Sequence, residues 1–167
     1  MFTQHTPESA PAASRPLIES TVAHLGHLPD AVARLAESPE MLGAFLQAND
    51  RFEASTLDPL AREVVVMTIA VRNGCRVCIA MHTGRLRQLS ASAPTIAALR
   101  NGETLDDPRL ATLQGFTLRV LATTGEVPEA EIEDFLAAGY TRRNALEVVL
   151  GIGTYTMSTL ANRLVRA

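Results

Sequence analysis

The segment LDPLAREVVVMTIAVRNGCRVCIAMHT, residues 57–83, largely determines the fold that we expect. Residues 64–71 within it are apolar on every side, which is typical of a helix at the centre of a core. The Asp-Pro pair at 58–59 is a helix-start signal, and the Asn-Gly pair at 73–74 is a helix-stop signal. A second helix is expected directly after this tight turn, over about 75–89. The segment therefore predicts a central antiparallel pair of helices.

The rest of the chain carries further helix signals. Ala and Leu, both strong helix formers, make up more than a quarter of the residues, and alternating strand-like runs are hard to find. We therefore expect an all-α fold. Start and stop signals place the other helices at about 17–25, 29–35, from 39 through 46, 94–102, 108–123, 128–139, and from 141 nearly to the chain end. In the last of these, Gly151 and Gly153 favour a close helix contact or an oligomer contact.

Two regions differ in composition. Residues 1–16 are rich in Pro, Ala and Ser and show little periodicity, so we expect a flexible N-terminal arm there. Residues 17–167 are expected to form one helical domain, since the length of 167 residues suits a single core.

Composition and charge exclude several classes of protein. Fifteen basic residues against 18 acidic ones give a net charge of −3, so a basic footprint for nucleic acid is missing. Every basic residue is Arg, which excludes lysine Schiff-base chemistry. The sequence has no apolar run of about 18 residues and no signal-peptide pattern, so we expect no membrane partner and a cytoplasmic location.

Four residues around the tight turn form a candidate site. Both cysteines of the chain, Cys75 and Cys78, lie three residues apart, and His82 follows four residues later. Positions i, i+3 and i+7 share one helix face, so these side chains fall on a single stripe. Glu63 lies about 11 residues before the turn, or roughly 16 Å of helical rise, and His82 about 8 residues after it, or roughly 12 Å. The two residues reach similar depth, which would let Glu63 orient His82.

These residue types suit thiol chemistry. Free N–H groups at a helix start favour a thiolate, and a C-x-x-C pair there can close a disulfide without unwinding the helix. His82, one turn beyond Cys78, can accept the thiol proton directly or through a water. The resulting order is a nucleophile, its base, and Glu63 as the group that holds the base.

Plainer interpretations also exist. A buried cysteine often packs as a small hydrophobic residue, His82 can be a solvated or core histidine, and Glu63 can be a surface acid in a first helical turn. Cys75, Cys78 and His82 could also be zinc ligands, with Glu63 or water as the fourth. A structural zinc site usually takes a second C-x-x-C or His pair, and the sequence contains none.

The pattern of Glu63, Cys75, Cys78 and His82 resembles that of the AhpD-like alkylhydroperoxidases in the carboxymuconolactone decarboxylase superfamily. The resemblance covers roughly residues 20–165. It implies an AhpD-like helical fold and a homo-oligomer, commonly a trimer or a hexamer. It further implies the reduction of a small hydroperoxide, with an external dithiol or protein reductant restoring the thiols and no metal, flavin or haem required.

The resemblance also implies a role for each residue. Cys78 would be the peroxidatic nucleophile, Cys75 would resolve its sulfenic acid into a disulfide, and His82 with Glu63 would relay protons. The helix-dipole argument alone favours Cys75 as the more acidic thiol, whereas the family and the adjacent His82 favour Cys78, which we adopt. The decarboxylase branch of the superfamily does not rely on this cysteine pair, so its presence argues against lactone decarboxylation.

One position departs from the family pattern. The best-studied members carry a second histidine directly before the latter cysteine, and here that position is Val77. Part of the proton network is then missing, so dithiol-disulfide exchange or redox sensing with weak peroxidase activity is an alternative function. Either function requires neighbouring sulfurs, with His82 and Glu63 beside them, in a pocket open to solvent.

Overall fold

The computed structural model describes residues 2–167, and within this range it contains α-helices, one short 3-10 helix (η1) and no strand. The elements are η1 (Ala12–Ser14), α1 (Arg15–Leu25), α2 (Asp30–Leu35), α3 (Pro39–Glu53), α4 (Pro59–Arg72), α5 (Arg76–Gln88), α6 (Ala93–Asn101), α7 (Pro108–Thr123), α8 (Glu129–Ala137) and α9 (Arg142–Val165). The predicted all-α fold is confirmed, and the helix boundaries lie close to the expected ones.

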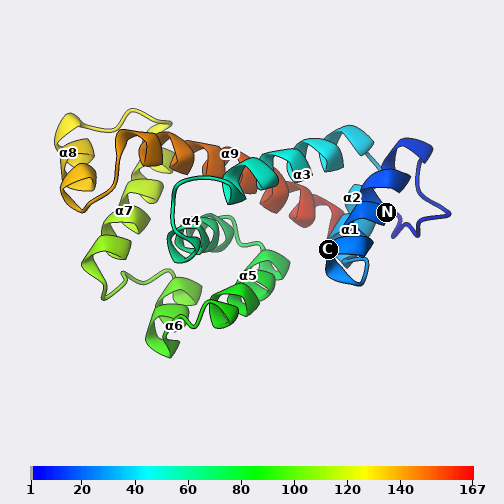
Figure 1. The fold of residues 1–167 in the computed structure, drawn as a ribbon, viewed down its shortest axis with the longest axis horizontal. Coiled ribbons are helices and arrows are strands. Elements are labelled where there is room, and N and C mark those ends of the chain that lie inside the picture. Colours follow the sequence, from blue (N-terminus) through cyan, green and yellow to red (C-terminus); the bar gives the residue numbers. More distant parts are fainter. Residues whose placement is uncertain (1) are drawn as a thin grey trace.

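Helix α4 forms the centre of the molecule. Its residues from Glu63 to Ala70 are all buried, as the all-round apolar sequence predicted. Helices α5, α7 and α9 pack around it, and Figure 1 shows it enclosed by them. The Asp58 side chain accepts a hydrogen bond from the Ala61 backbone and Pro59 occupies the first turn, which fixes where α4 begins.

The turn between α4 and α5 reverses the chain within three residues. Gly74 has a φ of +64°, a left-handed conformation that favours glycine. The Cys75 backbone N–H donates to Ala70 O at 2.9 Å, which closes the end of α4, and Cys75 then serves as the N-cap of α5. The predicted central antiparallel helix pair carrying the CxxC motif is confirmed.

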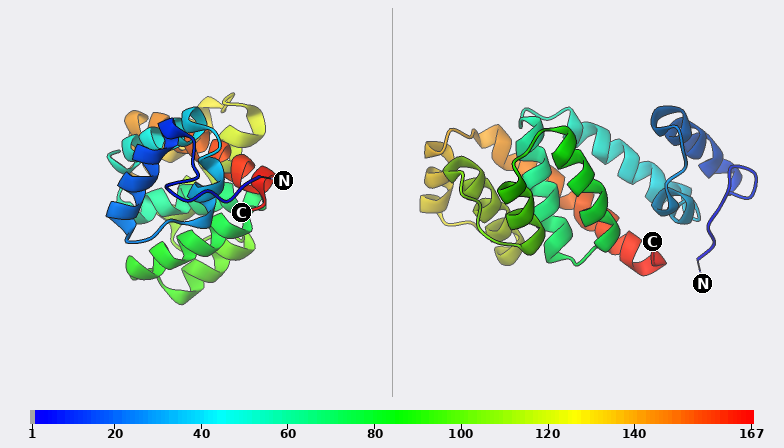
Figure 2. Two further views of the ribbon diagram at one scale, coloured as in Figure 1. Left: turned by 90° about the vertical axis from the view of Figure 1, so that its right-hand side faces the viewer. Right: turned by 90° about the horizontal axis from the view of Figure 1, so that it is seen from below.

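Helix α9 crosses the whole molecule and joins two cores (Figures 1 and 2). The larger core surrounds α4, and the smaller one lies where α1, α2 and α3 meet the end of α9 at Val165. Gly151 lets α9 approach α3 and α4 closely, because a Cβ there would lie 2.7 Å from Phe52 Cε2 and 3.1 Å from Val65 Cγ1. The expected close contact is present at Gly151, whereas a Cβ on Gly153 would meet open space.

The predicted N-terminal arm lies along the smaller core. The His5 backbone N–H donates to Ala33 O at 3.1 Å, and the Ser14 hydroxyl donates to Ala36 O at 2.7 Å. Ala10 is buried in the same core. Met1 lies outside the described residues, and the flexibility of residues 1–16 stays a prediction. Between residues 2 and 167, no helix has the combination of length and apolar character needed to span a bilayer.

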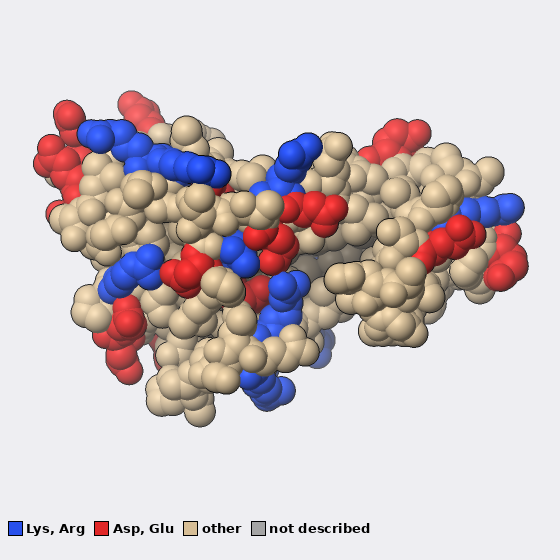
Figure 3. All heavy atoms as spheres, in the orientation of Figure 1, with Lys and Arg blue, Asp and Glu red and all other residues tan. Residues whose placement is uncertain are grey.

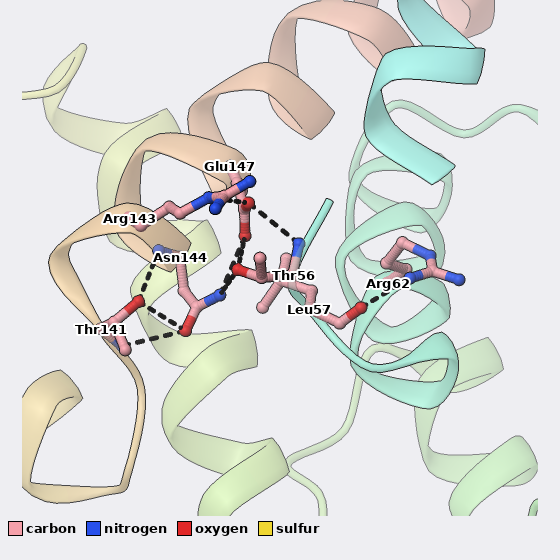
Figure 4. Close-up of polar contacts among 7 residues, drawn as sticks. All are labelled: Thr56, Leu57, Arg62, Thr141, Arg143, Asn144 and Glu147. Atoms are coloured by element: carbon pink, nitrogen blue, oxygen red, sulfur yellow. Dashed lines mark hydrogen bonds and ion pairs between the residues drawn. The ribbon is translucent and has the colours of Figure 1, made fainter. Parts of the chain in front are cut away.

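A buried carboxylate ties the start of α9 to the loop before α4 (Figure 4). Glu147 accepts hydrogen bonds from Thr56 N at 2.9 Å, Thr56 Oγ1 at 2.8 Å and Asn144 Nδ2 at 2.9 Å, and it pairs with Arg143 Nε at 3.0 Å. Thr141 and Asn144 form a capping box at the same helix start. Burial acts to raise the pKa of Glu147, but these donors outweigh it and lower that pKa below its usual value.

We expect Gly151→Ala to lower the free energy of unfolding by about 1–3 kcal/mol, because Phe52 is fully buried and has little room to move. Gly153→Ala is the matched control on the same helix and should raise stability by up to about 1 kcal/mol. Urea unfolding followed by circular dichroism measures both. Equal effects from the two variants would contradict the close approach at Gly151.

We expect Glu147→Gln to lower the free energy of unfolding at pH 7 by about 1–3 kcal/mol, since charged hydrogen bonds become neutral ones. The folded-state pKa of Glu147 is depressed, so its contribution is complete above the ordinary value of 4.5 and is lost as the pH falls through the folded pKa. The difference from the wild type should therefore shrink between pH 5 and pH 3 in thermal unfolding. The exposed residue Glu133 supplies the control variant Glu133→Gln. A difference that stays constant with pH would refute the assignment.

Candidate active site

The two cysteines are joined by a disulfide at the start of α5. Cys75 is the N-cap residue and Cys78 lies in the first turn, with their Cα atoms 5.3 Å apart. The helix is intact beneath them, because Ile79 N donates to Cys75 O at 3.0 Å. Ala70 of α4 packs against both cysteines, with Ile79 beside them. The disulfide therefore lies at the α4–α5 turn, beside the backbone N–H groups at the start of α5.

A buried imidazole–carboxylate pair lies one turn further along α5. His82 Nδ1 is 2.8 Å from Glu63 Oε2, and their side chains are 6% and 3% exposed. An ionised carboxylate only accepts hydrogen bonds, so Nδ1 carries the proton and Nε2 is the basic nitrogen. The interpretation of Glu63 as a surface acid is therefore wrong, since α5 folds back over it. The structure brings Glu63 and His82 together, as their similar distances from the helix turn predicted.

An arginine on α5 completes the environment of Glu63. Arg85 Nε lies 3.2 Å from Glu63 Oε1, and Arg85 Nη2 lies 3.3 Å from Glu53 Oε1. Glu53 also pairs with Arg62 Nε at 3.5 Å. On the face drawn in Figure 3, acidic and basic side chains are mixed in this way. Each oxygen of Glu63 thus has one cationic or N–H partner, which offsets the cost of burying the carboxylate.

Helix α9 supplies two further side chains that sequence reasoning did not single out as site residues. The Tyr155 ring meets the His82 ring edge-on, with centroids 5.4 Å apart, and its hydroxyl donates to Asn49 Oδ1 at 2.8 Å. Burial, together with the Glu63 charge, raises the pKa of Tyr155 far above its usual range, so the hydroxyl stays protonated. Asn162 Nδ2 donates to Cys78 Sγ at 3.4 Å.

Access to the sulfurs is narrow. Cys75 is 1% exposed and Cys78 is 4% exposed, so the expected open pocket is missing in this disulfide form. A hollow of about 370 Å³ lies instead between α3 and the start of α9, lined in part by Arg51, Leu146 and Leu150. Surface side chains around the cysteines must move before another molecule reaches them.

The arrangement lacks direct contact between the base and the sulfur. Across residues 2–167, no hydrogen bond joins His82 to either cysteine, so a proton would pass between them through a water or a bound molecule. Val77, at the position that departs from the family pattern, packs beside the cysteines as an apolar neighbour. Within the same described range, no three His, Cys, Asp or Glu side chains are grouped to hold a metal ion.

Comparison with known proteins confirms the resemblance seen in the sequence. Residues 36–113 match the model of the carboxymuconolactone decarboxylase family. This match includes Glu63, Cys75, Cys78 and His82. Among curated proteins, no relative matches the chain.

Three crystal structures share the fold. An AhpD-core, peroxidase-related protein from Ralstonia eutropha JMP134 is 22% identical with a TM-score of 0.86, over 98% of this chain and 88% of that one. A peroxidase-related protein from Silicibacter sp. TM1040 is 22% identical with a TM-score of 0.80, over 99% and 87%. A variant of the debrominase Bmp8, in complex with 2,3,4-tribromopyrrole, is 15% identical with a TM-score of 0.75, over 100% and 90%. The AhpD-like fold is therefore established.

We expect Glu63→Ala to lower the free energy of unfolding by about 2–4 kcal/mol, because it leaves the buried Nδ1–H of His82 without an acceptor. Glu53→Ala, which removes partly exposed ion pairs with Arg62 and Arg85, should cost less than about 1 kcal/mol. Chemical denaturation of both variants measures the difference. A Glu63 variant as stable as the Glu53 variant would show that the His82–Glu63 pair is not formed.

Proposed function

We propose that this chain, as a relative of the AhpD-like proteins, reduces small hydroperoxides through a dithiol–disulfide cycle at Cys75 and Cys78. One observation carries the proposal: a redox-capable cysteine pair and a His82–Glu63 couple are buried on the same face of α5. The names of two structural relatives, both peroxidase-related proteins, support the same class of activity.

The cycle begins with the reduced protein. The Cys78 thiol first passes its proton to Nε2 of His82. The thiolate then attacks the terminal oxygen of the hydroperoxide, the O–O bond breaks, and the leaving alkoxide takes that proton back from His82. Cys78 becomes a sulfenic acid. The Cys75 thiol then condenses with it, which releases water and forms the disulfide. An external dithiol or a protein reductant attacks this disulfide and restores both thiols. The cycle requires neither a metal nor a flavin nor a haem.

The positions of the two cysteines support Cys78 as the nucleophile. His82 lies four residues after Cys78 on the same helix face, and Asn162 already donates a hydrogen bond to Cys78 Sγ. Cys75, as the N-cap residue, lies a turn further from the imidazole. A base one turn away on the same helix face outweighs the small advantage that the helix dipole gives to Cys75.

The proposal also covers the oligomeric state and the cellular location of the protein. We propose a cytoplasmic homo-oligomer, a trimer or a hexamer, as the resemblance implies. Several apolar side chains of α9 remain exposed in the single chain, which supports burial against another copy. These are Leu146, Val149, Leu150, Leu160 and Leu164.

Val77 and the low exposure of the sulfurs favour a second function, dithiol–disulfide exchange or redox sensing. Val77 adds no polar group to the proton network, which leaves His82 as the imidazole beside the cysteines. A protein partner that opens this site would then be the natural oxidant. With this second function, the chain itself would reduce a disulfide of its partner but would consume hydroperoxide no faster than a free thiol does.

Peroxide consumption by the purified protein, with a dithiol as reductant, separates the two functions. We expect turnover in the wild type and none in Cys78→Ser. Cys75→Ser should complete one turnover and hold a sulfenic acid that dimedone traps and mass spectrometry detects. His82→Ala should slow turnover about 10²–10⁴-fold, as for loss of a general acid–base, whereas His24→Ala on the surface of α1 should not.

Full turnover in Cys78→Ser would refute the proposed mechanism. Disulfide exchange without hydroperoxide consumption in the wild type would favour the second function.

A further inference from the structure

Asn162 is a buried amide beside the candidate nucleophile. It lies near the end of α9, is 6% exposed, and reaches across to α5, where Nδ2 donates to Cys78 Sγ at 3.4 Å. Its Oδ1 is buried and has no hydrogen-bond partner among the described residues. Because an unpartnered buried amide oxygen is costly, a purely structural role does not account for it.

The position of Asn162 is held firmly. Arg163 Nη1 donates to Asn73 O at 2.6 Å, and Asn73 Nδ2 donates to Thr159 Oγ1 at 2.8 Å, so α9 is fastened to the α4–α5 turn at two points. Asn162 Nδ2 also lies 3.5 Å from Ser158 Oγ on its own helix. The amide is thus fixed next to Cys78 rather than placed there by a mobile side chain.

We infer that Asn162 is a further catalytic residue, whose Nδ2 group stabilises the Cys78 thiolate while its Oδ1 atom accepts a hydrogen bond from the O–H of the hydroperoxide. The inference rests on the proposed peroxidase function. An amide presents a donor and an acceptor side by side, so one group can hold the sulfur and the oxygen that it attacks. This places the terminal oxygen against Cys78 Sγ.

The step is balanced. The thiolate gives an electron pair to the terminal oxygen, the S–O bond forms as the O–O bond breaks, and the leaving alkoxide takes from His82 the proton that the Cys78 thiol had given up. The sulfur is oxidised by two electrons and the hydroperoxide is reduced by two. Asn162 transfers no proton, because it only donates and accepts hydrogen bonds through the step. It therefore supplies polar contacts to Cys78 that the apolar side chain of Val77 cannot supply.

The thiolate part of the inference is tested without turnover. In a reduced Cys75→Ser background, the rate of Cys78 alkylation by iodoacetamide is measured against pH. Replacement of Asn162 by Leu removes the donor, and Asn162→Asp exchanges it for an anionic oxygen. Both should move the alkylation midpoint upward by about one pH unit or more.

Two comparisons make the shift specific. His82, one turn after Cys78 on α5 and paired with Glu63 of α4, and Arg163, which follows Asn162 on α9, are unchanged in these variants. Thr154→Val on α9 removes a buried hydroxyl that bonds only its own helix, so its midpoint should match the parent. An unchanged midpoint in folded Asn162→Leu would overturn the inference.

The substrate part is tested by stopped-flow oxidation of Cys78 with hydrogen peroxide, each variant at a pH where its thiol is fully ionised. Asn162→Leu should still react about 10- to 100-fold more slowly than its parent, because the contact to the attacked oxygen is lost. Equal rates would refute the role of Oδ1. If the wild type itself fails to consume peroxide, the proposed function falls, whereas the alkylation result stands independently.

Folding of the variants is checked by circular dichroism. If neither Asn162 variant folds, the side-chain amide signals of Asn162 in the reduced wild type are followed by NMR against pH. They should move with the same midpoint as Cys78 alkylation. Asn162 signals that do not respond to Cys78 ionisation would overturn the inference.

Discussion

The chain reversal at Gly74 is the constraint on which the rest of the structure depends. Its left-handed backbone ends α4 and starts α5 within three residues, so the two helices lie antiparallel and in contact. This single geometry places Glu63 beside His82 and puts Cys75 and Cys78 at a helix start. A longer turn would let the helices slide, and a shift of one residue on α5 would rotate His82 away by about 100°.

The architecture could be predicted well from the sequence because the signals that specify each helix act over short stretches of the chain. Capping residues such as Asp58 and Thr141 act within one turn, and the apolar run in α4 reports its own burial. The sequence also predicted Glu63 opposite His82, since one short turn fixes their relative depth. Arg85 was visible in principle, three residues after His82 on the same face, but an exposed arginine on a helix carries no distinguishing signal.

Asn162 and Tyr155 could not be predicted, for a different reason. Asn162 lies 84 residues from Cys78 in the sequence, and Tyr155 lies 73 residues from His82. Both belong to a helix that combines buried polar side chains with exposed leucines. The usual rule that apolar residues face the core fails on α9, because Thr154, Ser158 and Thr159 are buried while Leu160 and Leu164 are not. Only the three-dimensional packing shows which face of α9 meets the turn.

The unbroken course of α9 bears on how the reactive sulfurs are protected while the protein is made. Helix α9 contacts the cysteine turn through Thr159, Asn162 and Arg163, which follow Cys78 by more than 80 residues in the chain. During synthesis from the N-terminus, Cys75 and Cys78 emerge long before these residues do. The nascent chain therefore carries these two thiols without the contacts of α9 until that helix docks, and a reducing compartment would keep them unpaired over that interval.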